Sequence, residues 1–320
     1  MSRLKRYTDS IDNFIRNKSC ISGDNLDNHN LITKEIDKCD HMCATLLLTV
    51  LNTACKKTKK TIHGYHMACG IDMIHMITRL LDDKIEYENE YGREKIRNTV
   101  AELSTCVYQS LSSNIDTVSF NMKDVAFKIQ TFCNNYLNKK IYKIVKYDGY
   151  VSSKKMQKSD ILNIKFKKED EIKEKLQKMY VVDKSIMLEK IESTYGAMCQ
   201  CSLVLGWVLG GGDEKHLESL EQLGIYLGIM FKLCKDFENI ENDILECGKI
   251  TNNFVVNSGI HESFGLFMDA KTKFMEGCLV LDIYSHTAKE IVDAIESKFD
   301  SCIENASLDM KTTYSSFSKH

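Results

Sequence analysis

The residues best suited to chemistry stand at the end of an apolar stretch, HMITRLLDDKIE, at positions 75–86. Asp82 and Asp83 are adjacent, and Glu86 follows three residues after Asp83. On one continuous helix, residues three and four apart share a face, so these carboxylates would lie together with Glu90. Mg²⁺ typically binds one or two carboxylates and completes its coordination with water and phosphate oxygens. The stretch therefore predicts a metal–diphosphate site at the mouth of an apolar cavity, and the alternative is a solvated acidic helix end.

A second apolar stretch, GIYLGIMFKLCKDFENIENDI at positions 224–244, also ends in polar and acidic residues. Asp236, Asn239 and Asp243 are spaced i, i+3 and i+7, which places them on one face of a continuous helix. Two apolar helices that both end in acidic faces could oppose each other and hold metal ions between them.

Helical periodicity dominates the elements that must position these residues. Ile71, Ile74, Ile77 and Leu81 recur every three or four residues, and further apolar positions between them predict a helix buried on most sides. The 320-residue chain contains no proline, which is compatible with long uninterrupted helices. We expect one all-α domain over 1–306.

Two regions differ from this pattern. Segment 139–178 contains thirteen lysines and no arginine, which favours a solvated helix–loop–helix excursion. A basic patch facing an anion or a membrane is the alternative, and a short hairpin or loop is credible at 142–153. We expect the polar tail 307–320 to be frayed.

Composition limits the classes of partner. Hydrophobic residues make up 43% of the chain, charged residues 28%, and the net charge is −2, so nothing in the average favours nucleic-acid binding. The thirteen cysteines form no CxxC pair, and the N-terminal stretch lacks a signal-peptide apolar region. No apolar run approaches the roughly 20 residues that span a bilayer. We therefore expect a cytoplasmic protein with reduced thiols and no stable membrane insertion.

Four segments, in order and spacing, resemble the trans-isoprenyl diphosphate synthases (polyprenyl synthetases), including divergent homologues of large DNA viruses. His75 followed by Asp82-Asp83-x-x-Glu86 is similar to the first aspartate-rich helix of that family. LGWVLGG at 205–211 is similar to its LGxxLGG segment. The stretch from Gly224 to Asn239 is similar to GxxxGxxFQxxDDxxD, and a GK pair follows at 248–249.

This resemblance implies an isoprenoid-synthase fold, which is a helical bundle around a central apolar cavity. It implies condensation of isopentenyl diphosphate with an allylic prenyl diphosphate, assisted by Mg²⁺ that grips the departing pyrophosphate. It also implies a homodimer, with a heteromer as the alternative. The candidate residues that follow from it, some at matching positions and some as substitutes nearby, are Asp82, Asp83 and Asp236 for catalysis, Asp82, Asp83, Glu86 and Asp236 for metal, and Lys38, Arg93, Lys190, Lys232, Lys235 and Lys249 for substrate.

The sequence departs from the family pattern at its second motif and its basic groups. Lys235 and Asn239 replace two aspartates, and Lys38 alone remains of an upstream basic segment. Thr194 and Tyr195 stand where a Lys-Thr pair is expected, so Lys190, one turn earlier, is the candidate substitute.

These departures leave two main interpretations open. The first is a divergent prenyltransferase, and the second is a weak or inactive prenyl-diphosphate-binding homologue or regulatory subunit. A terpene cyclase or head-to-head synthase is a more remote alternative. The resemblance also implies that Ile77 and Thr78, just before the acids, lie where the family gauges product length; neither is aromatic, so it implies geranylgeranyl or longer products.

Overall fold

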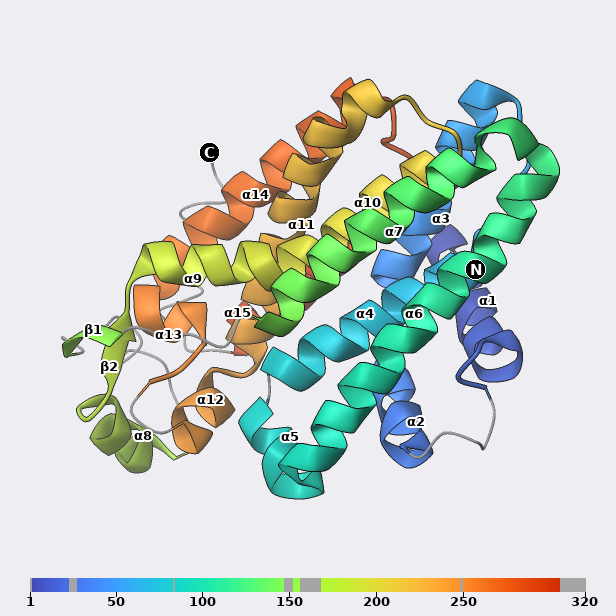
Figure 1. The fold of residues 1–320 in the computed structure, drawn as a ribbon. Helices are drawn as coiled ribbons and strands as arrows, with labels where there is room; N and C mark the ends of the chain where they lie inside the picture. Colours follow the sequence, from blue (N-terminus) through green and yellow to red (C-terminus); the bar gives the residue numbers. More distant parts are fainter. Residues whose placement is uncertain are drawn as a thin grey trace.

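The computed structural model describes residues 2–22, 28–82, 84–146, 152–155, 168–247 and 250–305. The side chains of 84–86, 152–155, 169, 304 and 305 are outside this description. The described part of the chain is built almost entirely of helices, so the all-α prediction is confirmed (Figure 1). The helices are α1 (Arg3–Lys18), α2 (His29–Asp37), α3 (Met42–Thr58), α4 (Tyr65–Asp82), α5 (Lys84–Tyr91), α6 (Arg93–Asn121), α7 (Lys123–Lys146), α8 (Glu169–Leu176), α9 (Lys184–Ile191), α10 (Ala197–Leu209), α11 (Leu217–Glu238), α12 (Ile240–Glu246), α13 (Phe254–Ser258), α14 (Ile260–Val280) and α15 (His286–Asn305). A π-helical turn η2 (Glu192–Gly196), a 3₁₀ turn η3 (Glu214–His216) and strands β1 (Ser152–Lys155) and β2 (Tyr180–Val182) complete the described elements.

Helices α4 and α10 form the centre of the bundle (Figure 1). Every residue of α10 is buried, and α4 is buried from Met67 to Thr78. Helix α4 packs against α3, α6, α7 and α10, while α10 packs against α3, α7 and α11. Helices that are apolar on all sides are stable only when surrounded in this way, as the sequence predicted for α4.

Glycine permits the closest helix contacts near the centre. A Cβ atom on Gly206 of α10 would lie 2.6 Å from the Leu47 carbonyl oxygen of α3. One on Gly228 of α11 would lie 2.4 Å from the backbone nitrogen of Gly196 in η2. Only glycine allows these backbones to touch, which explains why glycine occurs at these positions of α10 and α11.

The prediction of one continuous acidic face after position 82 needs correction. Helix α4 ends at Asp82, and Glu86 and Glu90 belong to the separate helix α5. Glu90 accepts a 2.7 Å hydrogen bond from Lys34 Nζ of α2. Likewise, α11 ends at Glu238, and Asp243 belongs to α12, so Asp236 and Asp243 do not share one helix.

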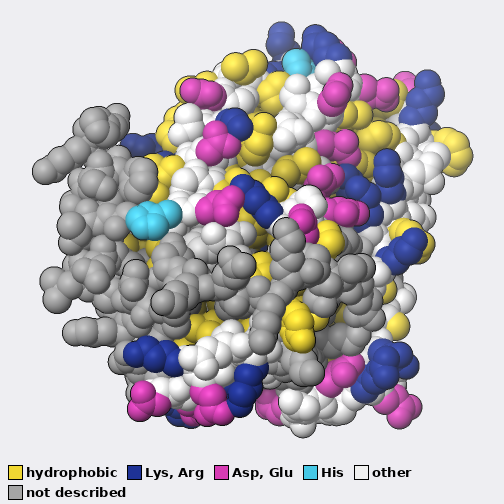
Figure 2. Space-filling view, turned by 90° about the vertical axis from the view of Figure 1, so that its left-hand side faces the viewer, with side chains coloured by type: hydrophobic (Ala, Val, Ile, Leu, Met, Phe, Trp, Pro, Cys, Tyr) yellow, Lys and Arg dark blue, Asp and Glu magenta, His cyan; other side chains and the backbone are white. Residues whose placement is uncertain are grey.

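The lysine-rich segment 139–178 begins inside α7 and includes α8. Strand β1 pairs antiparallel with β2 at 180–182. Most of the stretch 142–153, where the sequence predicted a short hairpin or loop, is either part of α7 or outside the described residues. Helix α8 packs on α12, beside the β1–β2 pair in Figure 1. On the face shown in Figure 2, the basic and acidic side chains that are coloured lie intermingled. Positions 147–151, 156–167 and the tail 307–320 lie outside the described residues.

All thirteen cysteines are free thiols, as predicted. No helix in the described ranges combines the length and the apolar character that crossing a bilayer requires.

Candidate functional site

The ends of α4 and α11 meet at the carboxylate of Asp82. Asp82 Oδ2 accepts hydrogen bonds from Lys232 Nζ at 3.0 Å and Lys235 Nζ at 3.2 Å. Its side chain is only 3% exposed. The prediction that these two helix ends oppose each other is therefore confirmed, but lysine ammonium groups fill the space between them.

Helix α9 and the π-helical turn η2 that follows it bring two further groups to the same carboxylate. Tyr195 Oη donates a 3.1 Å hydrogen bond to Asp82 Oδ2, and Lys190 Nζ lies 3.5 Å from Asp82 Oδ1. Residues five apart would diverge on an α-helix, whereas the i→i+5 bonding of η2 turns Tyr195 toward the side of Lys190. Lys190, the candidate substitute for the lysine of the expected Lys-Thr pair, thus lies beside Asp82.

Asp236 is held from both sides. Its Oδ1 accepts a 2.7 Å bond from Lys232 Nζ, and its Oδ2 accepts a 2.8 Å bond from the backbone N–H of Phe254. Asn253 Nδ2 donates to the Asp236 carbonyl oxygen at 2.7 Å and to Asp243 Oδ2 at 2.8 Å. The N-terminal end of α13, through Asn253 and the Phe254 N–H, therefore fixes the end of α11 and orients Asp236 toward Lys232.

We call the group of three lysines, two aspartates and one tyrosine the lysine cluster; its members are Asp82, Lys190, Tyr195, Lys232, Lys235 and Asp236. Burial alone would raise the pKa of Asp82, but the charges of Lys232, Lys235 and Lys190 hold it well below its ordinary value. Burial lowers the pKa of Lys190 to about 8. Burial also raises the pKa of Asp236 to about 7, against the opposing charge of Lys232. The cluster carries more positive than negative charge.

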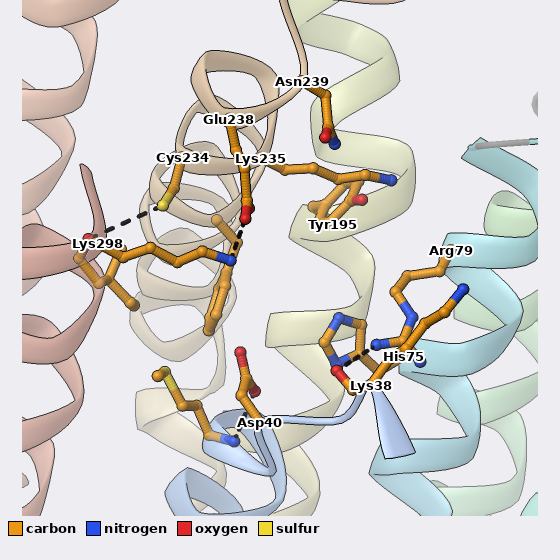
Figure 3. Close-up of a pocket in the computed structure, with 13 residues that line it drawn as sticks. Lys38, Asp40, His75, Arg79, Tyr195, Cys234, Lys235, Glu238, Asn239 and Lys298 are labelled. Carbon is orange, nitrogen blue, oxygen red and sulfur yellow. Dashed lines mark hydrogen bonds and ion pairs between the residues drawn. The ribbon is translucent and has the colours of Figure 1, made fainter. Parts of the chain in front are cut away.

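A pocket of about 370 Å³, here the outer pocket, lies beside the cluster (Figure 3). Tyr195 and Lys235 belong to both, and Lys235 is the most exposed lysine of the cluster, at 18%. The other charged side chains that line the pocket are Lys38, Asp40, Arg79, Glu238 and Lys298. With four cations and two carboxylates, the pocket suits an anionic ligand.

Buried Glu35 of α2 orients the basic groups at one end of this pocket. It accepts a 3.1 Å bond from Arg79 Nε and a 2.5 Å bond from Tyr87 Oη. Lys38 Nζ donates to Tyr87 Oη at 2.8 Å and lies 3.1 Å from Glu35 Oε1. The sequence alone did not assign Arg79 to the site. Its position as an arginine within an apolar helix was the signal that could have identified it as a site residue.

His75 and Lys298 are two further pocket residues that the sequence did not assign to the site. Burial, together with the charges of Arg79 and Lys235, lowers the pKa of His75 to about 4. Lys298 of α15 pairs with Glu238 of α11 at 2.7 Å. Only the packing of α15 on α11 places it there, so no local pattern could have revealed it.

Several predicted site residues are not brought into this arrangement. Arg93 is 62% exposed, lies 3.7 Å from Glu88, and is not among the residues that line the outer pocket. Asp83 and Lys249 lie outside the described residues, as does the side chain of Glu86.

The described residues do not fit a magnesium ion. Mg²⁺ requires oxygen ligands at about 2.0–2.1 Å in near-octahedral geometry. Ammonium groups contact both aspartates of the cluster, and Asp236 Oδ2 is bonded to a backbone N–H. No group of three or more His, Cys, Asp or Glu side chains in the described ranges could hold a metal ion.

Comparison with solved structures identifies the fold. The chain superimposes on a geranyltranstransferase from Thermotoga maritima with a TM-score of 0.61 at 12% identity, covering 95% of this chain and 100% of that one. A geranylgeranyl pyrophosphate synthetase from the archaeon Geoglobus acetivorans gives 0.60 at 15% identity, covering 92% and 97%. A Helicobacter pylori geranyltransferase, complexed with magnesium and isoprenyl diphosphate, gives 0.59 at 14%, covering 94% and 99%.

No protein-family model matches the chain, and no curated protein matches it either. At these low identities the structural likeness establishes the isoprenoid-synthase fold. The fold class predicted from the sequence is thereby confirmed, while the activity has to be argued from the site itself.

Proposed function

We propose that the protein is a divergent trans-prenyltransferase that joins isopentenyl diphosphate to an allylic prenyl diphosphate. The observation that carries this proposal is the pair of adjacent cationic places, the lysine cluster and the outer pocket, which share Lys235 and Tyr195. A condensation of two diphosphate esters needs two such places side by side. A protein that binds a single diphosphate needs only one.

The lysine cluster is assigned to the allylic diphosphate, and the outer pocket to isopentenyl diphosphate. When the allylic carbon–oxygen bond breaks, pyrophosphate leaves with the bonding electrons, and ammonium groups nearby offset its charge. The double bond of isopentenyl diphosphate then attacks the allylic carbon, and the released pyrophosphate accepts the proton whose loss from the new cation restores a double bond. Lys190, Lys232 and Lys235 bind the leaving group, while Asp82 and Asp236 position those lysines.

The outer pocket holds the second diphosphate through cations that other elements fix in place. Lys38 and Arg79 are oriented by Glu35 and Tyr87, and Lys298 by Glu238. Arg93 and Lys249 stay predictions as substrate contacts, and Asp83 and Glu86 stay predictions as acidic ligands.

Magnesium is the cofactor that the sequence resemblance implies, and a solved structure of the same fold contains it. Bound to the first acidic segment together with phosphate oxygens, it would add positive charge near the leaving group. Asp83 and Glu86 are the residues that would have to hold it, since lysines contact Asp82 and Asp236. Magnesium in this chain stays a prediction.

A specific observation favours a second candidate, a prenyl-diphosphate-binding protein without turnover. Both aspartates of the lysine cluster are engaged by lysines, and one preorganised charge is worth roughly 3–4 kcal/mol in a transition state. Such a protein would act as a regulatory subunit of a heteromer. It binds the same ligands but forms no product.

Incubation with radiolabelled isopentenyl diphosphate and farnesyl or geranylgeranyl diphosphate, with and without Mg²⁺, separates the two candidates. The transferase gives chain-extended products whose formation falls at least tenfold in Lys232→Gln. Binding of a prenyl diphosphate without any extended product would replace the first candidate by the second. The geranylgeranyl or longer product, a resemblance to viral homologues and a cytoplasmic location also stay predictions.

We further propose a homodimer. Phe120 and Phe127, on either side of the turn between α6 and α7, are 90% and 78% exposed. Two aromatic side chains this exposed suit contact with a second copy, because aromatic residues are enriched at protein interfaces. A heteromer through the same surface is the alternative.

A further inference from the structure

The charge of the lysine cluster is opposite to that of a metal site. Three ammonium groups surround Asp82, from Lys190, Lys232 and Lys235, at distances of 3.0–3.5 Å from its oxygens. One further carboxylate, Asp236, balances Lys232 at 2.7 Å. Counted over these five side chains alone, with both aspartates ionised, the charges sum to one positive charge.

This arrangement is built into the core and is not a surface coincidence. The side chains of Lys190 and Lys232 are 6% and 5% exposed, and those of Asp82 and Asp236 are 3% and 1% exposed. Buried charges persist only when they are paired and hydrogen-bonded. A Mg²⁺ ion at Asp82 would have to displace these ammonium groups or lie beside them in a poorly screened environment, and either is costly.

The same geometry favours an anion. An ammonium group has three N–H donors on a flexible stem, so it can keep one bond to Asp82 and donate another to a phosphate oxygen. Lys235 reaches both Asp82 and the outer pocket, which gives an incoming phosphate group a path to the cluster. Tyr195 Oη is a further donor at the same carboxylate.

We propose that the lysine cluster binds a diphosphate group without a divalent metal ion, with the ammonium groups of Lys190, Lys232 and Lys235 in the role that metal ions would otherwise have. This inference rests on the proposed function for the identity of the ligand, but its test does not depend on turnover. Lys235 distinguishes the cluster from a metal site, because it is a lysine at the position where the second motif would have an aspartate.

Titration calorimetry of the full chain with inorganic pyrophosphate, in EDTA and in excess Mg²⁺, tests the inference. We expect pyrophosphate to bind in EDTA, and Mg²⁺ alone to give no binding heat. Lys190→Gln and Lys235→Gln each weaken pyrophosphate binding in EDTA by roughly tenfold, the loss expected for one charge-assisted contact. Lys273→Gln, which removes an exposed lysine of α14, is the matched control and leaves the affinity unchanged.

A conversion variant tests the charge argument in the opposite direction. Lys232→Gln combined with Lys235→Asp turns the net charge of the cluster from positive to negative. We expect this variant to bind Mg²⁺ and to require Mg²⁺ for pyrophosphate binding. The variant leaves buried carboxylates unpaired, which should lower its unfolding temperature. A higher unfolding temperature with Mg²⁺ than without it is therefore the second readout.

Two results would overturn the inference. One is pyrophosphate binding to the unchanged protein that requires Mg²⁺. The other is binding in EDTA that neither Lys190→Gln nor Lys235→Gln weakens. Pyrophosphate binding in EDTA without any chain-extended product would keep the inference and reject the transferase, whereas Mg²⁺-dependent binding with product would do the reverse.

Discussion

At the scale of single residues, Asp82 has the position expected of a metal ligand but the neighbours of a structural ion-pair partner. Its side chain is 3% exposed, and three lysines and a tyrosine surround it. A carboxylate in such surroundings is ionised because its neighbours are cationic, and it serves to hold them in place.

Replacement of Asp82 by asparagine keeps the shape but removes the charge that separates three ammonium groups. We expect a loss of about 3–5 kcal/mol in the free energy of unfolding, the usual cost of leaving buried charges unpaired. Pyrophosphate should restore more stability to Asp82→Asn than to the unchanged protein, since the anion replaces the missing charge. Chemical denaturation with and without pyrophosphate measures both effects.

Asp269→Asn is the control, because Asp269 is 54% exposed and its pair with Lys273 contributes about 0–1 kcal/mol. An Asp82→Asn protein as stable as this control would contradict the role assigned to Asp82.

Buried His75 makes the free energy of unfolding depend on pH. Burial is the main reason that its pKa lies at about 4, below the ordinary value of 6.5, so the folded protein keeps it neutral. As the pH falls from 6.5 toward 4, the unfolded chain binds a proton that the folded protein does not, and stability decreases by about 3 kcal/mol from this residue. Below pH 4 both states are protonated and the loss levels off.

Denaturation at pH 7 and pH 4.5 checks this prediction. The difference between the two pH values should be smaller in His75→Gln than in the unchanged protein. His286→Gln, at a histidine that is 66% exposed, should leave the difference as it was. An identical pH dependence in all three proteins would show that His75 does not contribute.

At the scale of helices, the site depends on how closely α11 approaches η2. Gly228 permits backbone contact between α11 and Gly196 of η2. Gly196 directly follows Tyr195, and Gly228 lies one turn before Lys232. A rigid contact there determines how far the two lysines of α11 lie from Asp82.

Gly228→Ala should push α11 away from η2, because the added carbon would lie 2.4 Å from a backbone nitrogen that cannot move independently. We expect about 1–3 kcal/mol of lost stability from overpacking, together with weaker pyrophosphate binding. Thermal unfolding and calorimetry measure these changes.

Gly265→Ala is the matched control on α14, where nothing lies within 4 Å of the new carbon. It should be neutral or stabilising by about 0.5–1 kcal/mol, since alanine is the better helix former. Equal effects of the two substitutions would contradict the close-contact argument.

At the scale of the whole molecule, the α6–α7 turn presents Phe120 and Phe127 to solvent. If this surface joins two copies, the double variant Phe120→Ser and Phe127→Ser converts the dimer to a monomer, because each ring contributes buried apolar area to the contact. Sedimentation velocity distinguishes the two states.

The control for the dimer uses Leu279→Ser and Val280→Ser, a second exposed apolar pair, 60% and 84% exposed, at the end of α14. This pair should leave the assembly unchanged. A monomeric unchanged protein, or dissociation by the control pair alone, would reject the proposed surface.

The sequence by itself determined the helical architecture and the segments that form the site. Apolar periodicity in α4 and α11 is a local property, and so are the acids and lysines at their ends, so both helices and their polar ends were predictable. Lys190 was also predictable as a substitute cation, because it lies one turn before the expected position.

Tertiary structure decided what those residues do to one another. Asp82 and Lys232 are 150 positions apart, and their contact arises only when α4 and α11 pack. The ion pairs of Arg79 with Glu35 and of Lys298 with Glu238 likewise join different helices. Whether a carboxylate binds a metal or an ammonium group depends on the charges within a few ångströms of it, and those neighbours come from distant parts of the chain.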